Sequence, residues 1–239
     1  MKERLGSLVS GNGTTFEHIV NSYNLHEHPI EPALLVASKP GIGAIKRAYD
    51  LDIPYEIVNP DDFRGNDRKV DEEGFGKRLL EVFEKHGVTV VTQNGWLHKT
   101  PKIVIDEFEE TIFNQHPGPK KETGKTYGRQ PHELMLYIAR ETGRNNGTEV
   151  IVHRVTENVD EGATVGRKYV PILDINESAE ILQKRALPNE HELFVEVLDR
   201  LSKGEISEME QEIEYVFSDE IDTVLKPAIA HAKEKYRRG

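Results

Sequence analysis

The chain of 239 residues contains no cysteine. This absence excludes thiol catalysis, disulfide bonds and zinc sites built from cysteine, and it is consistent with a reducing cytoplasm. Long apolar runs are also missing, because none approaches the roughly 20 residues of a membrane-spanning helix and none at the N-terminus resembles a signal peptide. We therefore predict a cytoplasmic protein that does not insert into membranes.

Positive charge is scarce as well. The chain contains 31 Lys and Arg residues against 42 Asp and Glu residues, which gives a formal net charge of -11 and a pI near 5.4. A surface with this balance repels nucleic-acid backbones, so we expect no nucleic-acid partner. A local basic pocket for one small anion remains compatible with it. The sequence indicates no oligomeric state.

Short apolar runs alternate along the chain with amphipathic stretches of helical spacing. Expected strands cover residues 4–10, 32–38, 55–59, 88–93 and a run that ends near residue 116, followed by 147–156 and 164–172, which we expect to pair at an edge. Expected helices cover 15–23, 43–51, 75–87, 131–143 and 178–204, where Pro188 should kink or break the last helix. This order predicts an α/β fold with a doubly wound, mostly parallel sheet.

Residues 205–239 follow this core as an acidic and then basic extension. Residues 213–217 have a strand-like composition, and the remainder is typical of a helical tail. We therefore predict one domain over residues 1–204 and a C-terminal strand and helix extension to which we assign no chemistry.

An amide and an imidazole stand two residues apart in "TIFNQHPGP", directly after an apolar run. In a strand, Asn114 and His116 would point to the same face, and the prolines that follow would end the strand. Ligands of doubly wound sheets bind at the carboxyl ends of the strands, where this pair would lie. An amide and an imidazole at one spot can stabilise an oxyanion and move a proton. The alternative is that His116 only caps a turn.

A glycine-rich turn, "SGNGTTF", connects the first expected strand to the first expected helix. Gly11 and Gly13 permit a tight turn, Thr14 and Thr15 can cap the helix, and the exposed N–H groups attract an anion. The third glycine of a dinucleotide fingerprint is missing, and so is the Gly-Lys-Ser/Thr ending of a Walker A loop. A monophosphate therefore fits this turn best, and a plain connecting turn is the alternative.

A carboxylate, Asp160, lies in the "VDEG" turn between two expected strands. An Asp before a Gly at such a place is usually a turn residue. The functional alternative is that Asp160 folds back to hydrogen-bond His116. Such a partner would raise the pKa of the imidazole and fix its tautomer.

Five segments occur in one order over roughly residues 5 to 200. They are "LVSGNGTTF", "NGWLHKTP", "FNQHPGP", "GTEV" with "VHRVTENVDEG", and "NEHELF". Together they resemble the phosphoribosylglycinamide formyltransferase family of the folate-dependent formyltransferases. The resemblance implies a Rossmann-like formyltransferase fold and formyl transfer from 10-formyltetrahydrofolate to the amine of phosphoribosylglycinamide in purine (IMP) synthesis, without a metal.

The resemblance also implies roles for individual residues. The catalytic residues would be Asn114, His116 and Asp160. The substrate phosphate would be bound by Gly13, Thr14 and Thr15, and the rest of the ribonucleotide would contact Asn12 and Glu190. The folate would contact Gly95, Trp96, Leu97, His98, Lys99 and Asn114.

Two segments depart from the family pattern. "GPKKETGKTYGRQPH" replaces the usual residues after His-Pro and carries a basic patch, Lys120, Lys121, Lys125 and Arg129. This patch either attracts the phosphate or the folate glutamate tail, or is an ordinary solvated loop. "WLHK" replaces the usual folate loop. An arginine that the family places before its third helix has no clear match, although Arg64 and Arg68 are candidates.

Alternative functions remain open at this point. One is another formyl-handling enzyme, either the methionyl-tRNA formyltransferase or the formyltetrahydrofolate hydrolase. The acidic extension argues against a tRNA-binding domain. The other is a phosphosugar-binding protein without activity on the same fold, since fold alone does not decide function.

Overall fold

The computed structural model describes residues 2–24, 28–209 and 213–237. The chain divides into two compact units. The N-terminal unit contains residues 1–114, 154–162 and 194–206, and the C-terminal unit contains residues 115–153, 163–193 and 207–239. Hydrogen bonds connect the strands in the order β3-β2-β1-β4-β5-β6-β7, so the predicted mostly parallel α/β sheet is confirmed.

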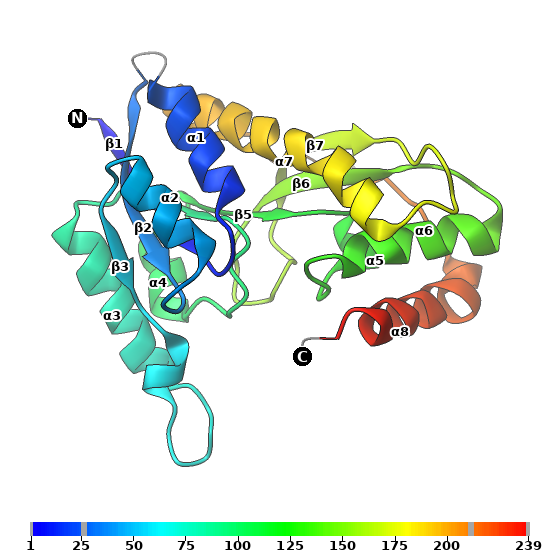
Figure 1. Ribbon diagram of the computed structural model, residues 1–239, viewed down its shortest axis with the longest axis horizontal. Helices are drawn as coiled ribbons and strands as arrows, with labels where there is room; N and C mark the ends of the chain where they lie inside the picture. The colour runs from blue at the N-terminus through cyan, green and yellow to red at the C-terminus, as the bar shows by residue number, and fades with distance from the viewer. Residues whose placement is uncertain (1, 25–27, 210–212, 238–239) are drawn as a thin grey trace. The chain divides into compact units, whose positions relative to one another are not determined.

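The N-terminal unit carries the parallel part of the sheet (Figure 1). Its strands are β1 (Glu3–Val9), β2 (Ile30–Ala37), β3 (Tyr55–Ile57), β4 (Val90–Gln93) and the start of β5 (Ile112–His116). Its helices are α1 (Thr14–Asn24), α2 (Gly43–Asp50), the short η1 (Pro60–Phe63), α3 (Glu72–Lys85) and α4 (Lys102–Glu107).

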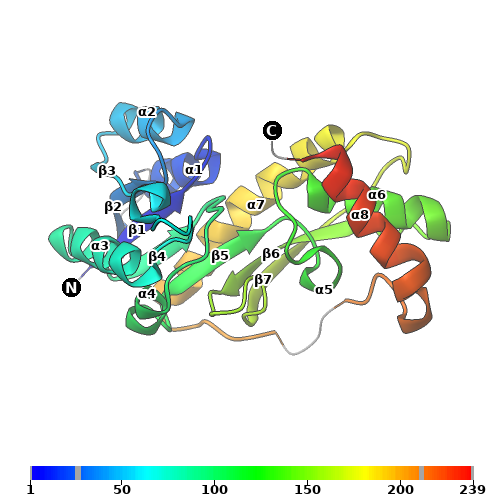
Figure 2. The same cartoon turned by 90° about the horizontal axis from the view of Figure 1, so that it is seen from below.

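Two apolar clusters cover the two faces of this part of the sheet. Leu34 and Val36 of β2 belong to the cluster under α3 and α4, whereas the alternate residues Leu35 and Ala37 belong to the cluster under α1 and α2. Figures 1 and 2 show these helix pairs on opposite faces. Because successive strand residues point to opposite faces, an uninterrupted apolar strand requires helices on both sides. The doubly wound arrangement follows from that pattern.

The C-terminal unit holds an antiparallel strand pair and several helices. Its elements are α5 (Lys120–Thr123), α6 (Gln130–Thr142), β6 (Thr148–Arg154), β7 (Thr164–Val170), the first part of α7 (Ala179–Ser202), η2 (Ser218–Glu220), η3 (Ile221–Leu225) and α8 (Lys226–Lys235). β6 and β7 pair antiparallel, and β7 ends the strand order, as predicted. In both views α8 lies along α6.

Two predictions about local structure need correction, the first in part. Pro188 does not break α7, which continues from residue 179 to residue 202, and the alternative of a kink stays a prediction. Residues 213–217 do not form a strand, because the backbone N–H groups of Tyr215 and Val216 donate to the carboxylate of Glu122 instead of to a neighbouring strand. The predicted helical tail is present as α8.

No helix in the described ranges is long and apolar enough to cross a membrane. Within the same ranges, no three His, Asp or Glu side chains are grouped so that they could hold a metal ion.

Candidate active site

The glycine-rich turn after β1 belongs to the N-terminal unit and leads directly into α1. Gly13 has φ +72°, and a Cβ at this position would lie 2.7 Å from Ala44 Cβ. Both its backbone conformation and the close approach of α2 therefore require glycine. Gly11 has no such steric constraint, since no atom lies within 4 Å of where its Cβ would be. Of the two glycines that the sequence suggested, only Gly13 shapes the turn by close approach.

Other contacts hold the same turn against α2. Arg47 Nε donates to the carbonyl oxygen of Asn12 at 2.9 Å. Thr15 is buried and Thr14 is half-buried at the first positions of α1. A helix start of this kind offers backbone N–H groups that are not used inside the helix. The turn can therefore receive an anion, and the assignment of a phosphate to it remains a prediction.

The loop after β4 meets this turn within the N-terminal unit. Ser10 N donates to the carbonyl oxygen of Gly95 at 3.3 Å, and Leu97 N donates to Ser10 Oγ at 3.1 Å. Gly95 has φ +73°, and the side chain of Leu97 is 41% exposed. The structure thus brings together the two segments that the sequence assigned to phosphate and to folate.

The side chains of this loop face different surroundings. The indole of Trp96 is buried and stacks on Phe75, and Trp96 Nε1 has no hydrogen-bond partner among the described residues. His98 packs edge-on against the indole. Lys99 Nζ forms an ion pair with Glu72 Oε2 of α3 at 3.1 Å. Trp96 is therefore part of the core. Leu97 is the exposed apolar side chain of the predicted folate loop.

The turn that carries Asp160 is tightly constrained. Asp160 has φ 61°, a left-handed conformation that few residues other than glycine adopt, and Asp is one that tolerates it. A Cβ at Gly162 would lie 1.9 Å from the carbonyl oxygen of Arg154, so glycine is required there. Strained positions of this kind occur preferentially at functional sites. The constraint fixes the backbone of the turn and with it the direction of the Cα–Cβ bond of Asp160.

The side chain of Asp160 reaches β5 within the N-terminal unit. Asn114 Nδ2 donates to Asp160 Oδ1 at 3.5 Å, which is a long hydrogen bond. The structure therefore brings together two of the three predicted catalytic residues. The pairing of Asp160 with the imidazole of His116 remains a prediction.

His116 is the last residue of β5 and lies in the C-terminal unit. It is 4% exposed, and its Nε2 lies 2.8 Å from Thr123 Oγ1. Thr123 Oγ1 in turn donates to the carbonyl oxygen of Pro119 at 2.7 Å. A hydroxyl has only one proton to donate, so Thr123 must accept from His116. The proton of the neutral imidazole is thus on Nε2. Sequence reasoning did not select Thr123 for this role.

A second imidazole, that of His132 on α6, is affected by the charge of His116. His132 is buried, and its burial, with a smaller contribution from the charge of His116, lowers the pKa of His132 to about 4. At neutral pH the His132 ring is therefore uncharged. Neither of its ring nitrogens has a hydrogen-bond partner among the described residues. Sequence reasoning missed His132 because a histidine in an apolar helix gives no signal of its neighbours.

Glu190 on α7, which the sequence assigned to the substrate, is a buried carboxyl group. Its burial raises its pKa to about 7. Gln115 Nε2 on β5 donates to Glu190 Oε2 at 3.0 Å. A carboxyl group with this pKa can exist in either protonation state near neutral pH. Gln115 lies between Asn114 and His116 on β5. Because successive strand residues point to opposite faces, the sequence pattern that selected Asn114 and His116 did not select Gln115.

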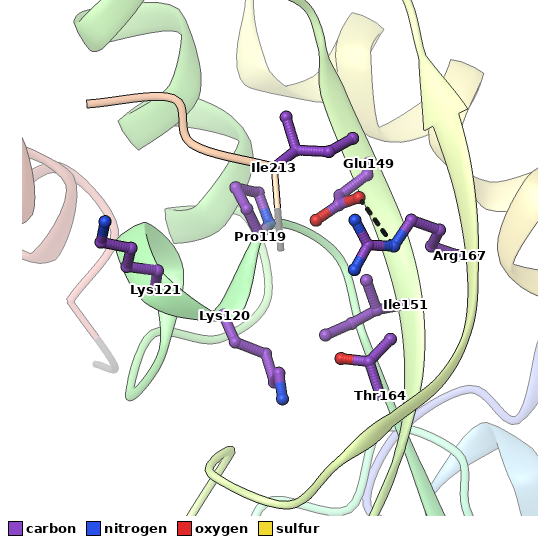
Figure 3. Close-up of a pocket in the computed structure, with 8 residues that line it drawn as sticks. All are labelled: Pro119, Lys120, Lys121, Glu149, Ile151, Thr164, Arg167 and Ile213. Atoms are coloured by element: carbon purple, nitrogen blue, oxygen red, sulfur yellow. Dashed lines mark ion pairs between the residues drawn. The ribbon is translucent and has the colours of Figure 1, made fainter. Parts of the chain in front are cut away.

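A pocket in the C-terminal unit borders the lysine-rich segment (Figure 3). It is lined by Pro119, Lys120, Lys121, Glu149, Ile151, Thr164, Arg167 and Ile213. Arg167 Nε lies 3.7 Å from Glu149 Oε2, and Lys121 forms an ion pair with Glu214. Within the predicted basic patch, Arg129 Nη1 also lies 3.1 Å from Glu180 Oε1. Acidic side chains thus pair with Lys121 and Arg129 of the patch. These ion pairs argue against attraction of an anion by the patch, but the segment is not an ordinary solvated loop, because α5 within it buries Glu122 and Thr123.

Comparison with known proteins agrees with this arrangement. Residues 3–198 match the family described as formyl transferase. The chain is 30% identical to the chloroplastic phosphoribosylglycinamide formyltransferase of Vigna unguiculata over 211 residues, which cover 86% of this chain and 62% of that protein. It is 26% identical to the trifunctional purine biosynthetic protein adenosine-3 of Gallus gallus, over 86% of this chain and 19% of that protein.

A solved structure extends the comparison to the fold. The crystal structure of glycinamide ribonucleotide transformylase 1 from Geobacillus kaustophilus has a TM-score of 0.70 and 27% identity to this chain, with 84% of this chain and 99% of that chain covered. By contrast, the chain spans less than two thirds of the length of the two curated relatives.

Proposed function

Because this chain belongs to the formyl transferase family, we propose that it transfers a formyl group from 10-formyltetrahydrofolate to the amine of phosphoribosylglycinamide, a step of purine (IMP) synthesis. The observation that carries this proposal is the hydrogen bond between Asn114 and Asp160 at the carboxyl end of β5. It joins an amide and a carboxylate in the motifs that the family resemblance assigns to catalysis. The names of the relatives support the same substrate.

The reaction needs stabilisation of an oxyanion and movement of protons. The substrate amine attacks the formyl carbon and forms a tetrahedral intermediate with a negatively charged oxygen. In our proposal the Asn114 amide donates a hydrogen bond to this oxygen, and the protonated imidazole of His116 stabilises its charge. As the C–N bond to the folate breaks, a proton passes from the attacking nitrogen to the departing folate nitrogen, and His116 assists that transfer.

The two nitrogens of His116 have different roles in this scheme. Because Nε2–H already donates to Thr123, Nδ1 is the ring atom that gains and loses the proton. The negative charge of Asp160 favours the protonated ring. The proposal requires Asn114, His116 and Asp160 to meet in the substrate complex. An attacking amine needs no nucleophile from the enzyme, which agrees with a chain that contains no cysteine.

The proposed binding roles follow the motifs of the family resemblance. Gly13, Thr14 and Thr15 would hold the substrate phosphate at the start of α1, with Asn12 beside it. The loop of residues 95–99 would contact the folate, mainly through its backbone and Leu97, which is exposed. Glu190 would contact the glycinamide ribonucleotide, and its raised pKa allows it to donate or accept a hydrogen bond there.

The bounds of the domain and the cellular location of the protein remain proposals as well. The formyltransferase domain would comprise residues 1–204, which contain the matched residues 3–198, and residues 205–239 would be an extension. The substrates are small molecules. The cytoplasmic location that the sequence predicts stays a prediction, and the Vigna unguiculata relative is named as a chloroplast protein.

The experiment that tests the function compares two reactions and the binding of each substrate by the purified full chain. Formyl transfer to phosphoribosylglycinamide, hydrolysis of 10-formyltetrahydrofolate without the ribonucleotide, and binding of each compound alone are measured in parallel. We expect transfer to exceed hydrolysis by at least about 100-fold, as selective catalysis requires. Hydrolysis at the same rate with and without the ribonucleotide would contradict the proposal and indicate the hydrolase. Binding of the ribonucleotide without folate would indicate a protein that only binds phosphosugars.

A further inference from the structure

The hydroxyl of Thr123 connects the imidazole of His116 to the backbone of the turn after β5. His116 Nε2 donates to Thr123 Oγ1 at 2.8 Å, and Thr123 Oγ1 donates to Pro119 O at 2.7 Å. Thr123 is fully buried, so water does not compete for these bonds. A valine has the same shape as threonine but lacks the oxygen. The hydroxyl of Thr123, a side chain outside the predicted site, therefore favours the tautomer of His116 that carries its proton on Nε2.

The geometry of the turn holds this hydroxyl in place. Pro119 O accepts a second hydrogen bond, from Thr123 N at 2.8 Å, so the backbone and the side chain of Thr123 share one acceptor. A Cβ at Gly118 would lie 2.6 Å from Thr123 Oγ1, so the turn packs directly against the hydroxyl. Thr126 also donates to the carbonyl oxygen of Thr123. The position of Thr123 Oγ1 is thus determined by several contacts.

The helix that carries Thr123 needs support from elsewhere. α5 has four residues, which is too short for a helix that is stable by itself. Glu122, the neighbour of Thr123, is buried, and its Oε1 accepts from Tyr215 N at 3.2 Å and from Val216 N at 3.3 Å. Lys121 forms an ion pair with Glu214. Residues 214–216 of the C-terminal extension, here called the clamp segment, therefore hold α5.

We propose that Thr123 is a positioning residue for His116, and that the clamp segment keeps it in position through Glu122. The catalytic role of His116 belongs to the proposed function, and this inference rests on it. The C-terminal extension thereby acquires a role, because it orders a helix of four residues whose last side chain sets the tautomer of the imidazole. Substituting Glu122 should therefore disturb the ring of His116 through Thr123.

The first test compares Thr123→Val with Thr123→Ser in the full chain. The ¹⁵N chemical shifts of the His116 ring report which nitrogen carries the proton, and kcat and KM are measured for the formyl transfer. We expect Thr123→Val to lose the pure Nε2–H tautomer and to lower kcat about tenfold with little change in KM, because the ring loses its acceptor and its orientation. Thr123→Ser retains the oxygen and should restore both readouts.

The second test addresses the clamp segment. Glu122→Ala removes the acceptor of both backbone N–H groups, and we expect it to change the His116 ring shifts in the same direction as Thr123→Val. Glu220→Gln is the matched control, because Glu220 also accepts a backbone N–H within the C-terminal extension, but from Phe217, which lies outside the clamp segment. The control should leave the ring shifts unchanged.

The two readouts separate the possible failures. Ring shifts that stay the same in Thr123→Val overturn this inference, whatever the activity is. Ring shifts that change while kcat stays the same overturn the positioning role. A His116→Ala variant with normal activity overturns the proposed function instead, and the ring measurements on Thr123 variants still stand. If Thr123→Val does not fold, Thr123→Ala with Thr123→Ser as its rescue provides the same comparison.

Discussion

The glycine-rich turn of the N-terminal unit and the surroundings of His116 in the C-terminal unit are built by different means. Backbone shape determines the turn, since Gly13 is required by its positive φ and by the closeness of Ala44. Side-chain hydrogen bonds determine the surroundings of His116, where a threonine hydroxyl and a buried carboxylate do the positioning. Steric changes should therefore damage the first region, and changes of protonation should damage the second.

The C-terminal unit also contains buried groups whose pKa values are shifted. Burial raises the pKa of Glu122 and of Glu190 to about 7, and lowers the pKa of His132 to about 4. All three groups belong to the C-terminal unit. We infer that a change of pH near neutrality alters the charge of Glu122 and Glu190 in the C-terminal unit and leaves His132 uncharged.

The largest effect is expected at the imidazole. His116→Ala should lower kcat at least about 100-fold, because it removes both the stabilising charge and the proton transfer. His231→Ala is the control, since His231 lies on α8 and pairs with Glu133 at 3.0 Å. Steady-state kinetics of formyl transfer measure both variants. Near-normal turnover in His116→Ala would contradict the role of the imidazole.

The second-largest effect is expected on ribonucleotide binding when the glycine-rich turn, whose shape depends on its backbone, is altered. Gly13→Ala should weaken binding of the ribonucleotide about 30-fold, equivalent to about 2 kcal/mol, because the new methyl group clashes with Ala44 and strains a left-handed residue. Gly11→Ala is a matched control two residues away, where the methyl group enters open space. Calorimetric titration with the ribonucleotide measures both. Equal losses in the two variants would show that shape is not what the turn contributes.

A smaller effect should appear at the carboxylate that contacts Asn114. Asp160→Asn keeps the size of the side chain and removes its charge, so the imidazole of His116 should have a lower pKa and kcat should fall about tenfold. Because the proposed mechanism needs the protonated ring, the alkaline limb of the pH–rate profile would then move to lower pH. A profile identical to that of the unaltered chain would count against electrostatic coupling between Asp160 and His116.

Most of the fold could be predicted from the sequence because the central strands β1, β2 and β4 contain runs of buried residues between polar turns. The strand predicted at residues 213–217 was wrong because its N–H groups donate to Glu122, which is distant in the sequence. Pro188 was expected to kink or break α7. The helix is not broken, and Asn189 Nδ2 next to the proline donates to the carbonyl oxygen of Arg185 at 3.1 Å.

The candidate site was predictable only in part. Motif order selected Asn114, His116 and Asp160, and the structure brings the amide and the carboxylate of this set together. Thr123 and Gln115 could not be selected, because a hydroxyl or an amide in a short helix or strand has no distinctive spacing. Their roles depend on which groups the folded chain buries beside them.

The smallest expected effect concerns the free energy of unfolding rather than catalysis, and it depends on the protonation of Glu122 in the C-terminal unit. Glu122 has a folded pKa of about 7 and an ordinary value of 4.5 when unfolded. Between these values the folded chain binds more protons than the unfolded chain, so Glu122 makes the free energy of unfolding decrease as pH rises from about 5 to about 7. Glu122→Gln keeps an oxygen that accepts from Tyr215 and Val216, but it does not titrate. Its free energy of unfolding should therefore fall less over this range, by on the order of 1 kcal/mol.

Urea unfolding at pH 5 and pH 7.5 measures this difference, and the contributions of Glu190 and His132 cancel when the variant is compared with the unaltered chain. Glu220→Gln removes a carboxylate from the same extension whose pKa is lowered by its hydrogen bond to Arg144, so it should not flatten the pH dependence. If Glu122→Gln and the unaltered chain lose stability equally between the two pH values, Glu122 ionises as an exposed carboxylate does. The clamp segment would then be held by packing rather than by a buried carboxyl group, and the contrast between the two regions would disappear at this position.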